Sequence, residues 1–183
     1  MKEKVKYKAE WEITKIRARD EKVRREIENK LKNGEEIYNA ISRYPDDVEV
    51  KHEFMRGNVL LNEGINTIWA LVAGDAGETP FNNSNAHLGV GDSAVAEDAG
   101  QTGLQGTNKT YMGMDNGYPQ YGSNQQIVFR ATFGENDANH AWNEFTVVNA
   151  SDDTGKNLNR KVESKGIKSS GEIWTLTLTI TLS

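Results

Sequence analysis

The glycine-rich stretch HLGVGDSAVAEDAGQTGLQG, residues 87–106, combines free backbone amides with carboxylates and is the first candidate for binding chemistry. Glycine loops bind phosphate when their N–H groups face the anion at the start of a helix. However, no Gly-Lys-Ser/Thr sequence follows, and Ala94 stands where the dinucleotide pattern needs a third glycine. Glu97 and Asp98 would also repel a phosphate. We therefore expect a solvated loop that leaves a strand, because Gly and Asp favour turns.

The remaining chemically active residue types are not spaced for catalysis or metal binding. Ser93 lacks the G-x-S-x-G surroundings of a hydrolase nucleophile. Glu97 and Asp98 have no partner at the separation that a depolymerase needs. Asp152 and Asp153 begin a segment without the alternating oxygens and closing glutamate of a calcium loop, which favours a plain β-turn. The histidines, far apart and without zinc-site spacing, are His52, His87 and His140. The sequence predicts no catalytic, cofactor or metal site, and hence no enzyme.

Three tyrosines in a polar segment suggest one binding alternative. Tyr111, Tyr118 and Tyr121 lie among glycines, asparagines and glutamines, and aromatic faces beside amides suit sugars. Pro119 and the neighbouring glycines instead favour a packed surface loop. The tyrosines are therefore candidate glycan contacts only in the alternative function given below.

Composition limits the possible partners. The chain has 183 residues, no cysteine and a net charge of −5, so disulfides and cysteine-based zinc sites are excluded. Residues 1–57 carry 15 Lys/Arg and 13 Asp/Glu, whereas residues 58–183 carry 7 and 14, a net charge of −7. An acidic body argues against nucleic-acid binding, which depends on neutralising phosphates. No apolar stretch reaches the roughly 20 residues that span a bilayer. The start, MKEKVKYKAEWEI, lacks a signal-peptide pattern and predicts synthesis in the cytoplasm.

The first predicted element is a strand in which apolar and charged residues alternate over residues 5–13. The apolar phase then shifts to Ile16, which predicts a bulge or bend near Thr14. Lys4, Lys6 and Lys8 line the charged face. They form either a docking surface for an acidic partner or a protection against edge pairing of the strand.

The second predicted element is a charged insertion, residues 20–47, with apolar residues at helical spacing. Its apolar positions include Ile27, Leu31, Tyr38 and Ile41. Asn33-Gly34 either ends a first helix or lies inside a longer one. The apolar face packs either on the protein's own sheet or on a partner. We predict that residues 1–57 form an attachment or oligomerisation element, with Lys4, Lys6, Lys8 and these four apolar residues as candidate interface.

Residues 58–183 are predicted to form the body. The segment NVLLNEGINTIWALVAG shows one helical stripe, and we expect its helix to be the best-buried one, with Gly74 as C-cap. The residues of the stripe are Leu61, Ile65, Ile68, Trp69 and Val72. Short alternating strands follow, ending with WTLTLTITL. The expected fold is mainly β: an antiparallel β-sandwich, jelly-roll-like or immunoglobulin-like, with one or two accessory α-helices.

The order of these segments resembles a pattern in structural proteins of tailed bacteriophages. It is carried, over residues 53–183, by NVLLNEGINTIWALVAG, HLGVGDSAVAEDAGQTGL, IVFRATFGENDANHAWNEFTVVNA, LNRKV and WTLTLTITL. The charged insertion departs from that pattern. The matching residues are glycines, turn formers and inward-facing apolar side chains, so the resemblance implies a fold and a virion role but no active site.

The resemblance leads to two expectations about function. The first is a capsid decoration or cement protein, bound in many copies to the major capsid protein and homo-oligomeric, because the chain lacks the length and repeats of a fibre shaft. The alternative is a tail-tip, baseplate or fibre module that contacts host glycans. Neither involves nucleic acid or a membrane.

Overall fold

Two antiparallel β-sheets form the body of the protein. The computed structural model describes residues 6–183. The first sheet contains, in spatial order, β2 (Val48–Arg56), β1 (Tyr7–Ala18), β10 (Glu172–Leu182), β7 (Gln126–Phe133) and β6 (Gln120–Tyr121). The second contains β3 (Val59–Leu60), β9 (Asn159–Val162), β8 (Glu144–Val148), β4 (His87–Gly91) and β5 (Lys109–Gly113). The predicted mainly β, sandwich-like fold is confirmed.

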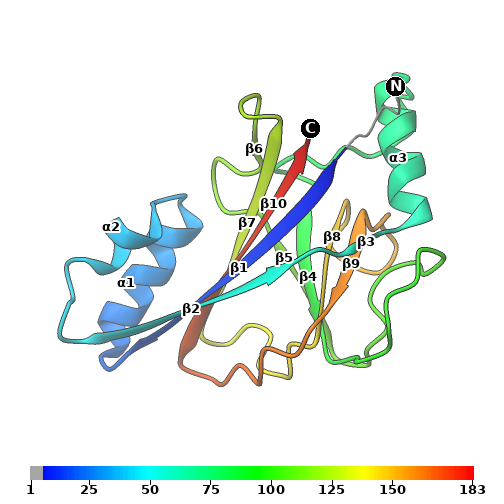
Figure 1. The fold of residues 1–183 in the computed structure, drawn as a ribbon. Helices are drawn as coiled ribbons and strands as arrows, with labels where there is room; N and C mark the ends of the chain where they lie inside the picture. The colour runs from blue at the N-terminus through cyan, green and yellow to red at the C-terminus, as the bar shows by residue number, and fades with distance from the viewer. Residues whose placement is uncertain (1–5) are drawn as a thin grey trace.

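The described residues contain three helices rather than the expected one or two: α1 (Glu21–Lys32), α2 (Ile37–Ile41) and α3 (Asn62–Val72). The extra helix arises because Gly34, at φ +87°, ends α1 and donates its N–H to Leu31 O. Asp20 begins α1 by accepting a hydrogen bond from the Val23 N–H. Figure 1 shows α1 and α2 at one end of the molecule and α3 at the other.

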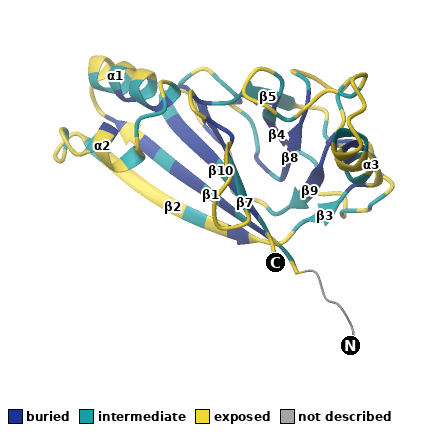
Figure 2. Cartoon of the chain, turned by 90° about the horizontal axis from the view of Figure 1, so that it is seen from above, coloured by how far each residue is buried: buried dark blue, intermediate teal, exposed yellow. Residues whose placement is uncertain are grey.

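The main core lies between the two sheets and is rich in aromatic side chains. The Trp142 ring lies edge-on to Phe133 and Trp174, with ring centroids 4.7 and 4.8 Å away. The Trp11 and Phe145 rings are 6.0 Å apart and join the two sheets. Such pairs stabilise the fold beyond the area they bury. Figure 2 shows buried residues along β1, β10 and β7, whereas β2 is mostly exposed.

β1 is buried on both of its faces. Trp11 and Ile13 face the second sheet, whereas Ile16 and Ala18 belong to a separate cluster under α1 and α2. The pairing of β1 with β10 and β2 is continuous through Thr14, so the predicted bulge is wrong. The apolar phase shifts because the covering layer changes from a sheet on one face to helices on the other.

The first sheet continues across the expected boundary at residue 57. β1 pairs with β10 along almost its whole length, and β2 pairs with the other edge of β1. Residues 6–57 therefore supply two strands of the sandwich, and within this described range the helical insertion is the part that lies outside the sheet.

Candidate functional site

The helical insertion packs on the protein's own sheet. Ile27 and Leu31 are fully buried together with Ile16, Ala18 and Ile173. The prediction that Ile27 and Leu31 contact a partner is therefore wrong, because the outer face of the first sheet already covers both side chains. The amphipathic pattern had left both locations open.

A buried cation fixes the end of α1 to the body. Arg130 of β7 donates from Nη2 to Leu31 O and Glu35 O, at 3.2 and 3.1 Å. Its Nε donates to Asp115 Oδ2 at 2.9 Å, and its guanidinium lies 4.3 Å from the Tyr118 ring centroid. A positive charge at a helix C-terminus is favourable. The insertion is thus attached by polar bonds as well as by apolar packing.

The other predicted interface residues differ in their exposure. Tyr38 is 77% exposed, whereas Ile41 is half-buried against the insertion's own core. Lys6 and Lys8 are exposed, and Lys8 pairs with Glu10 at 2.8 Å. Lys8 precedes the residues of β1 that pair with β2, so an unpaired strand edge exists at this end. Lys4 lies outside the described residues.

Helix α3 buries Leu61 at the start of its apolar stripe but leaves the later part of the stripe exposed, so the expectation of the best-buried helix is wrong. Trp69 is 64% and Val72 71% exposed, and Ile68 is also exposed. The residues of α3 that are buried are Gly64 and Thr67. A Cβ added to Gly64 would lie 2.4 Å from the Leu158 Cα. The helix backbone therefore contacts the segment before β9 through its small-residue side, and this close packing rotates the large apolar residues outward.

The two ends of α3 are nevertheless well fixed. Near the N-terminus, Leu61 N–H donates to Leu158 O at 3.1 Å, and Glu63 Oε1 accepts from Asn157 N–H at 2.8 Å. Gly74, at φ +78°, closes the C-terminus with an N–H bond to Leu71 O, as predicted. The exposed residues Ile68, Trp69 and Val72 therefore lie on a helix whose two ends are fixed by hydrogen bonds.

An apolar groove of about 320 Å³ lies between α3 and the end of the first sheet. Its lining is almost wholly apolar and includes Tyr7, Leu60, Ile68, Leu71, Phe81 and Leu182. Leu182 is 52% exposed at the groove. Ile68 belongs to both the groove and the stripe, so the two form one apolar surface. We call this the α3 surface and define it by Ile68, Trp69, Val72 and the groove residues.

The three tyrosines of the glycan alternative do not gather at one place. Tyr118 is buried under Arg130, so the prediction that it contacts a glycan is wrong. Tyr111 of β5 donates its hydroxyl to Asp153, and burial together with that carboxylate raises the pKa of Tyr111. Tyr121 is 78% exposed on β6, an edge strand of the other sheet. Only Tyr121 presents its ring freely to solvent.

The glycine-rich loop after β4 is organised by a buried ion pair. Arg160 Nη2 and Glu144 Oε2 are 2.8 Å apart, and both side chains are fully buried. Glu144 accepts from the N–H groups of Gln105 and Gly106. Arg160 donates to Val95 O, Ala96 O and Gln101 Oε1. The N–H groups of Gln105 and Gly106 are bound to Glu144 and not free for a phosphate, and the network fixes the loop.

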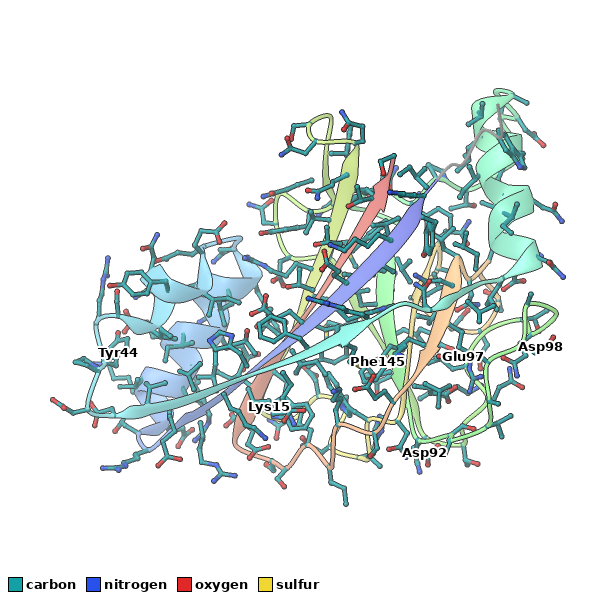
Figure 3. The ribbon with its side chains drawn as sticks, viewed as in Figure 1. Lys15, Tyr44, Asp92, Glu97, Asp98 and Phe145 are labelled. Carbon is teal, nitrogen blue, oxygen red and sulfur yellow. The ribbon has the colours of Figure 1, made fainter. Side chains whose placement is uncertain are left out.

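The loop carboxylates cap the backbone. Glu97 accepts from Val162 N–H, and Asp98 accepts from Gly100 N–H. Asp92 accepts from Thr107 and Asn108, and the Asn108 side-chain bond leads the lowering of the pKa of Asp92. Figure 3 labels Asp92, Glu97 and Asp98 along the loop. Their hydrogen bonds give each carboxylate a structural role.

The histidines lie on separate elements. His52 is 2.9 Å from Glu12 Oε1, His87 bonds to Asn85 O, and His140 bonds to Ala141 O. Asp152 caps Thr154 N–H, as in a β-turn. Across residues 6–183, no group of three or more His, Cys, Asp or Glu side chains is placed to hold a metal ion.

Sequence reasoning missed the buried charges. Arg130 interrupts the mostly apolar run IVFRATF, Glu144 precedes FTVV, and Arg160 alternates with Leu158 and Val162 on one side of LNRKV. A charge inside such a run is a detectable signal for a buried ion pair. Which charges pair with each other was not detectable, because the pairing depends on strand order.

Comparison with protein-family models, curated protein sequences and solved structures finds no match for this chain. None of the helices in the described part is long and apolar enough to cross a membrane.

Proposed function

We propose that this chain is a structural protein of a tailed-bacteriophage virion and that it attaches to the particle through the α3 surface. The observation that carries the proposal is the exposed apolar stripe of α3, with Trp69 and Val72 mostly in solvent. Exposed apolar patches of this kind are typical of protein interaction sites. The order of sequence segments that resembles phage structural proteins supports the virion role.

The contact chemistry favours another folded protein as the occupant. Tryptophan is enriched among the residues that dominate interface energies, especially beside a pocket that excludes water. The apolar groove shares Ile68 with the stripe, so a partner that covers the stripe can place an apolar side chain in the groove beside Ile68. We take the major capsid protein as this partner, which makes the chain a head decoration or cement protein.

The insertion fits attachment less well than α3. Its apolar residues Ile27 and Leu31 are buried internally, which leaves Tyr38 as its large exposed hydrophobic side chain. The glycan alternative is weaker because Tyr118 is buried and Tyr111 is bound to Asp153.

Binding to heads that lack this protein tests the proposal. We expect the purified chain to co-sediment with such heads. Trp69→Ser should weaken binding by roughly 30-fold or more, the loss of about 2 kcal/mol expected for a central interface residue. Tyr38→Ser, which removes a similarly exposed ring at the opposite end, is the matched control and should bind normally.

Two results would contradict the proposal. Recovery of the protein only in tail fractions would exclude the head placement. Normal head binding by Trp69→Ser, together with weakened binding by Tyr38→Ser, would move the attachment site to the insertion.

A further inference from the structure

Lys168, in the segment that precedes β10, is a fully buried lysine held by uncharged groups. Its Nζ donates to Gly134 O at 2.6 Å and to Asn139 Oδ1 at 2.9 Å. Lysine is almost never fully buried unless it is paired with a charge. A buried amine in contact with a side-chain amide is a potential nucleophile facing an electrophile.

The amine and the amide carbon are close enough to react. A carbonyl carbon lies about 1.2 Å from its oxygen, so Lys168 Nζ is within about 4.1 Å of Asn139 Cγ. Reacting atoms in productive complexes are about 3 to 3.5 Å apart. Less than about an ångström of side-chain movement separates the two geometries.

The loop from β7 to β8 holds the amide toward the lysine. Asn139 Nδ2 donates to Glu135 O at 3.0 Å, which leaves Oδ1 directed at Lys168. Ala138, the preceding residue, has φ +50°, an unfavourable backbone conformation for a residue with a Cβ. Trp142 Nε1 and His140 N–H both donate to Ala138 O and help to hold this turn. Backbone strain of this kind is often found at functional sites.

The environment also favours the neutral, nucleophilic form of the amine. Burial lowers the pKa of Lys168 to about 8, although nearby carboxylates, Asp137 foremost, oppose this effect. Roughly a tenth of the amine is therefore unprotonated at pH 7 and about half at pH 8, far more than for an ordinary lysine. Asn139 is exposed, so a small leaving group can escape to solvent.

We propose that Lys168 and Asn139 form an intramolecular amide cross-link. The Lys168 ammonium first gives a proton to solvent, and the Nζ lone pair then attacks Asn139 Cγ. The C–N bond to Nδ2 breaks, and that nitrogen leaves as ammonia, taking the second proton lost by Nζ. The product is a Cγ–Nζ amide that joins the β7–β8 connection to the segment before β10, and no oxidant or cofactor is needed.

The intact mass of the purified chain tests this proposal. After incubation of the folded protein near pH 8, the denatured chain should be lighter than its sequence by one ammonia molecule. Trypsin should then release residues 131–156 joined to residues 166–183, because the modified Lys168 is no longer a cleavage site. A mass equal to that of the sequence would overturn the proposal, whatever any variant does.

Variants assign the two partners. Lys168→Met and Asn139→Ala should both keep the full sequence mass. Asn136→Ala, an exposed asparagine of the same loop, is the matched control and should lose ammonia as the wild type does. A mass deficit that persists in Asn139→Ala, or that also occurs in protein kept in urea, would show that ammonia comes from another site and would contradict the proposal.

Discussion

Replacing Arg160 by methionine should destabilise the protein strongly. The substitution removes the guanidinium that pairs with Glu144 at 2.8 Å and leaves that carboxylate fully buried without its cation. It also removes the donors to Val95 O, Ala96 O and Gln101, while methionine retains much of the side-chain volume.

The expected magnitude follows from the burial of the pair. Removing one partner of a buried ion pair costs about 3 to 5 kcal/mol, because the remaining charge is desolvated and uncompensated. For a chain of this length, each kcal/mol lowers the melting temperature by about 2 to 4 °C. Arg160→Met should therefore melt roughly 6 to 20 °C below the wild type.

Urea titration and thermal melting followed by circular dichroism measure this loss. The control is Arg25→Met, which breaks an exposed pair with Glu21 whose side chains are 66% and 61% exposed. An exposed i,i+4 pair contributes only about 0.3 to 0.5 kcal/mol. The double variant Glu144→Leu/Arg160→Met should recover part of the loss, because no buried charge remains.

The reasoning is refuted if the free energies of unfolding of Arg160→Met and Arg25→Met differ by less than about 1 kcal/mol. Such a result would mean that solvent reaches Glu144 or that the loop after β4 does not depend on this network. Limited proteolysis would then show equal cleavage of the loop in both variants.

Three further outcomes are expected. Gly64→Ala should lower the free energy of unfolding in urea titration by about 1 to 3 kcal/mol, because its Cβ would lie 2.4 Å from the Leu158 backbone. Gly113→Ala, whose Cβ would lie at an ordinary 3.6 Å from His87, should lower it less. Equal losses in the two variants would contradict the close packing of α3. Arg130→Met should increase proteolytic cleavage between α1 and β2, since Leu31 O and Glu35 O lose their donor, and wild-type cleavage rates would contradict this. Burial alone would raise the pKa of Glu53. The Lys15 and Lys51 ammonium groups have the larger combined effect, so the net pKa lies below the ordinary 4.5. The unfolded state then binds more protons on acidification, so the free energy of unfolding should fall as the pH drops below about 4.5, and should fall less in Glu53→Gln; an identical pH dependence of the two proteins would argue against the lysine contacts.

Much of the fold was predictable because it depends on local patterns. The two-residue alternation of the terminal strands predicted the sandwich, and Gly74 marked the end of α3. The phase shift at Thr14 was visible, but its cause was not: the residues after it face helices that begin later in the chain. Periodicity detects that a side of a strand is buried and does not identify the covering layer.

The candidate site was less predictable because exposure depends on tertiary packing. The stripe with Trp69 predicted a buried helix, yet Gly64 allows the opposite side of α3 to approach Leu158 more closely than any larger residue would. Tyr118 likewise appeared in a polar segment, and only the placement of Arg130 shows why it is covered. In both cases one close contact between distant segments decides which aromatic ring meets solvent.

Oxidative footprinting of the free and particle-bound chain tests the central claim most directly. In the free protein Trp69, Tyr38 and Tyr121 are 64%, 77% and 78% exposed, so all three should be oxidised by hydroxyl radicals. On phage heads, attachment through the α3 surface predicts that Trp69 becomes protected while Tyr38 stays reactive, with Tyr121 as an internal reference. Continued oxidation of Trp69 in the bound protein, with Tyr38 protected instead, would contradict attachment through α3.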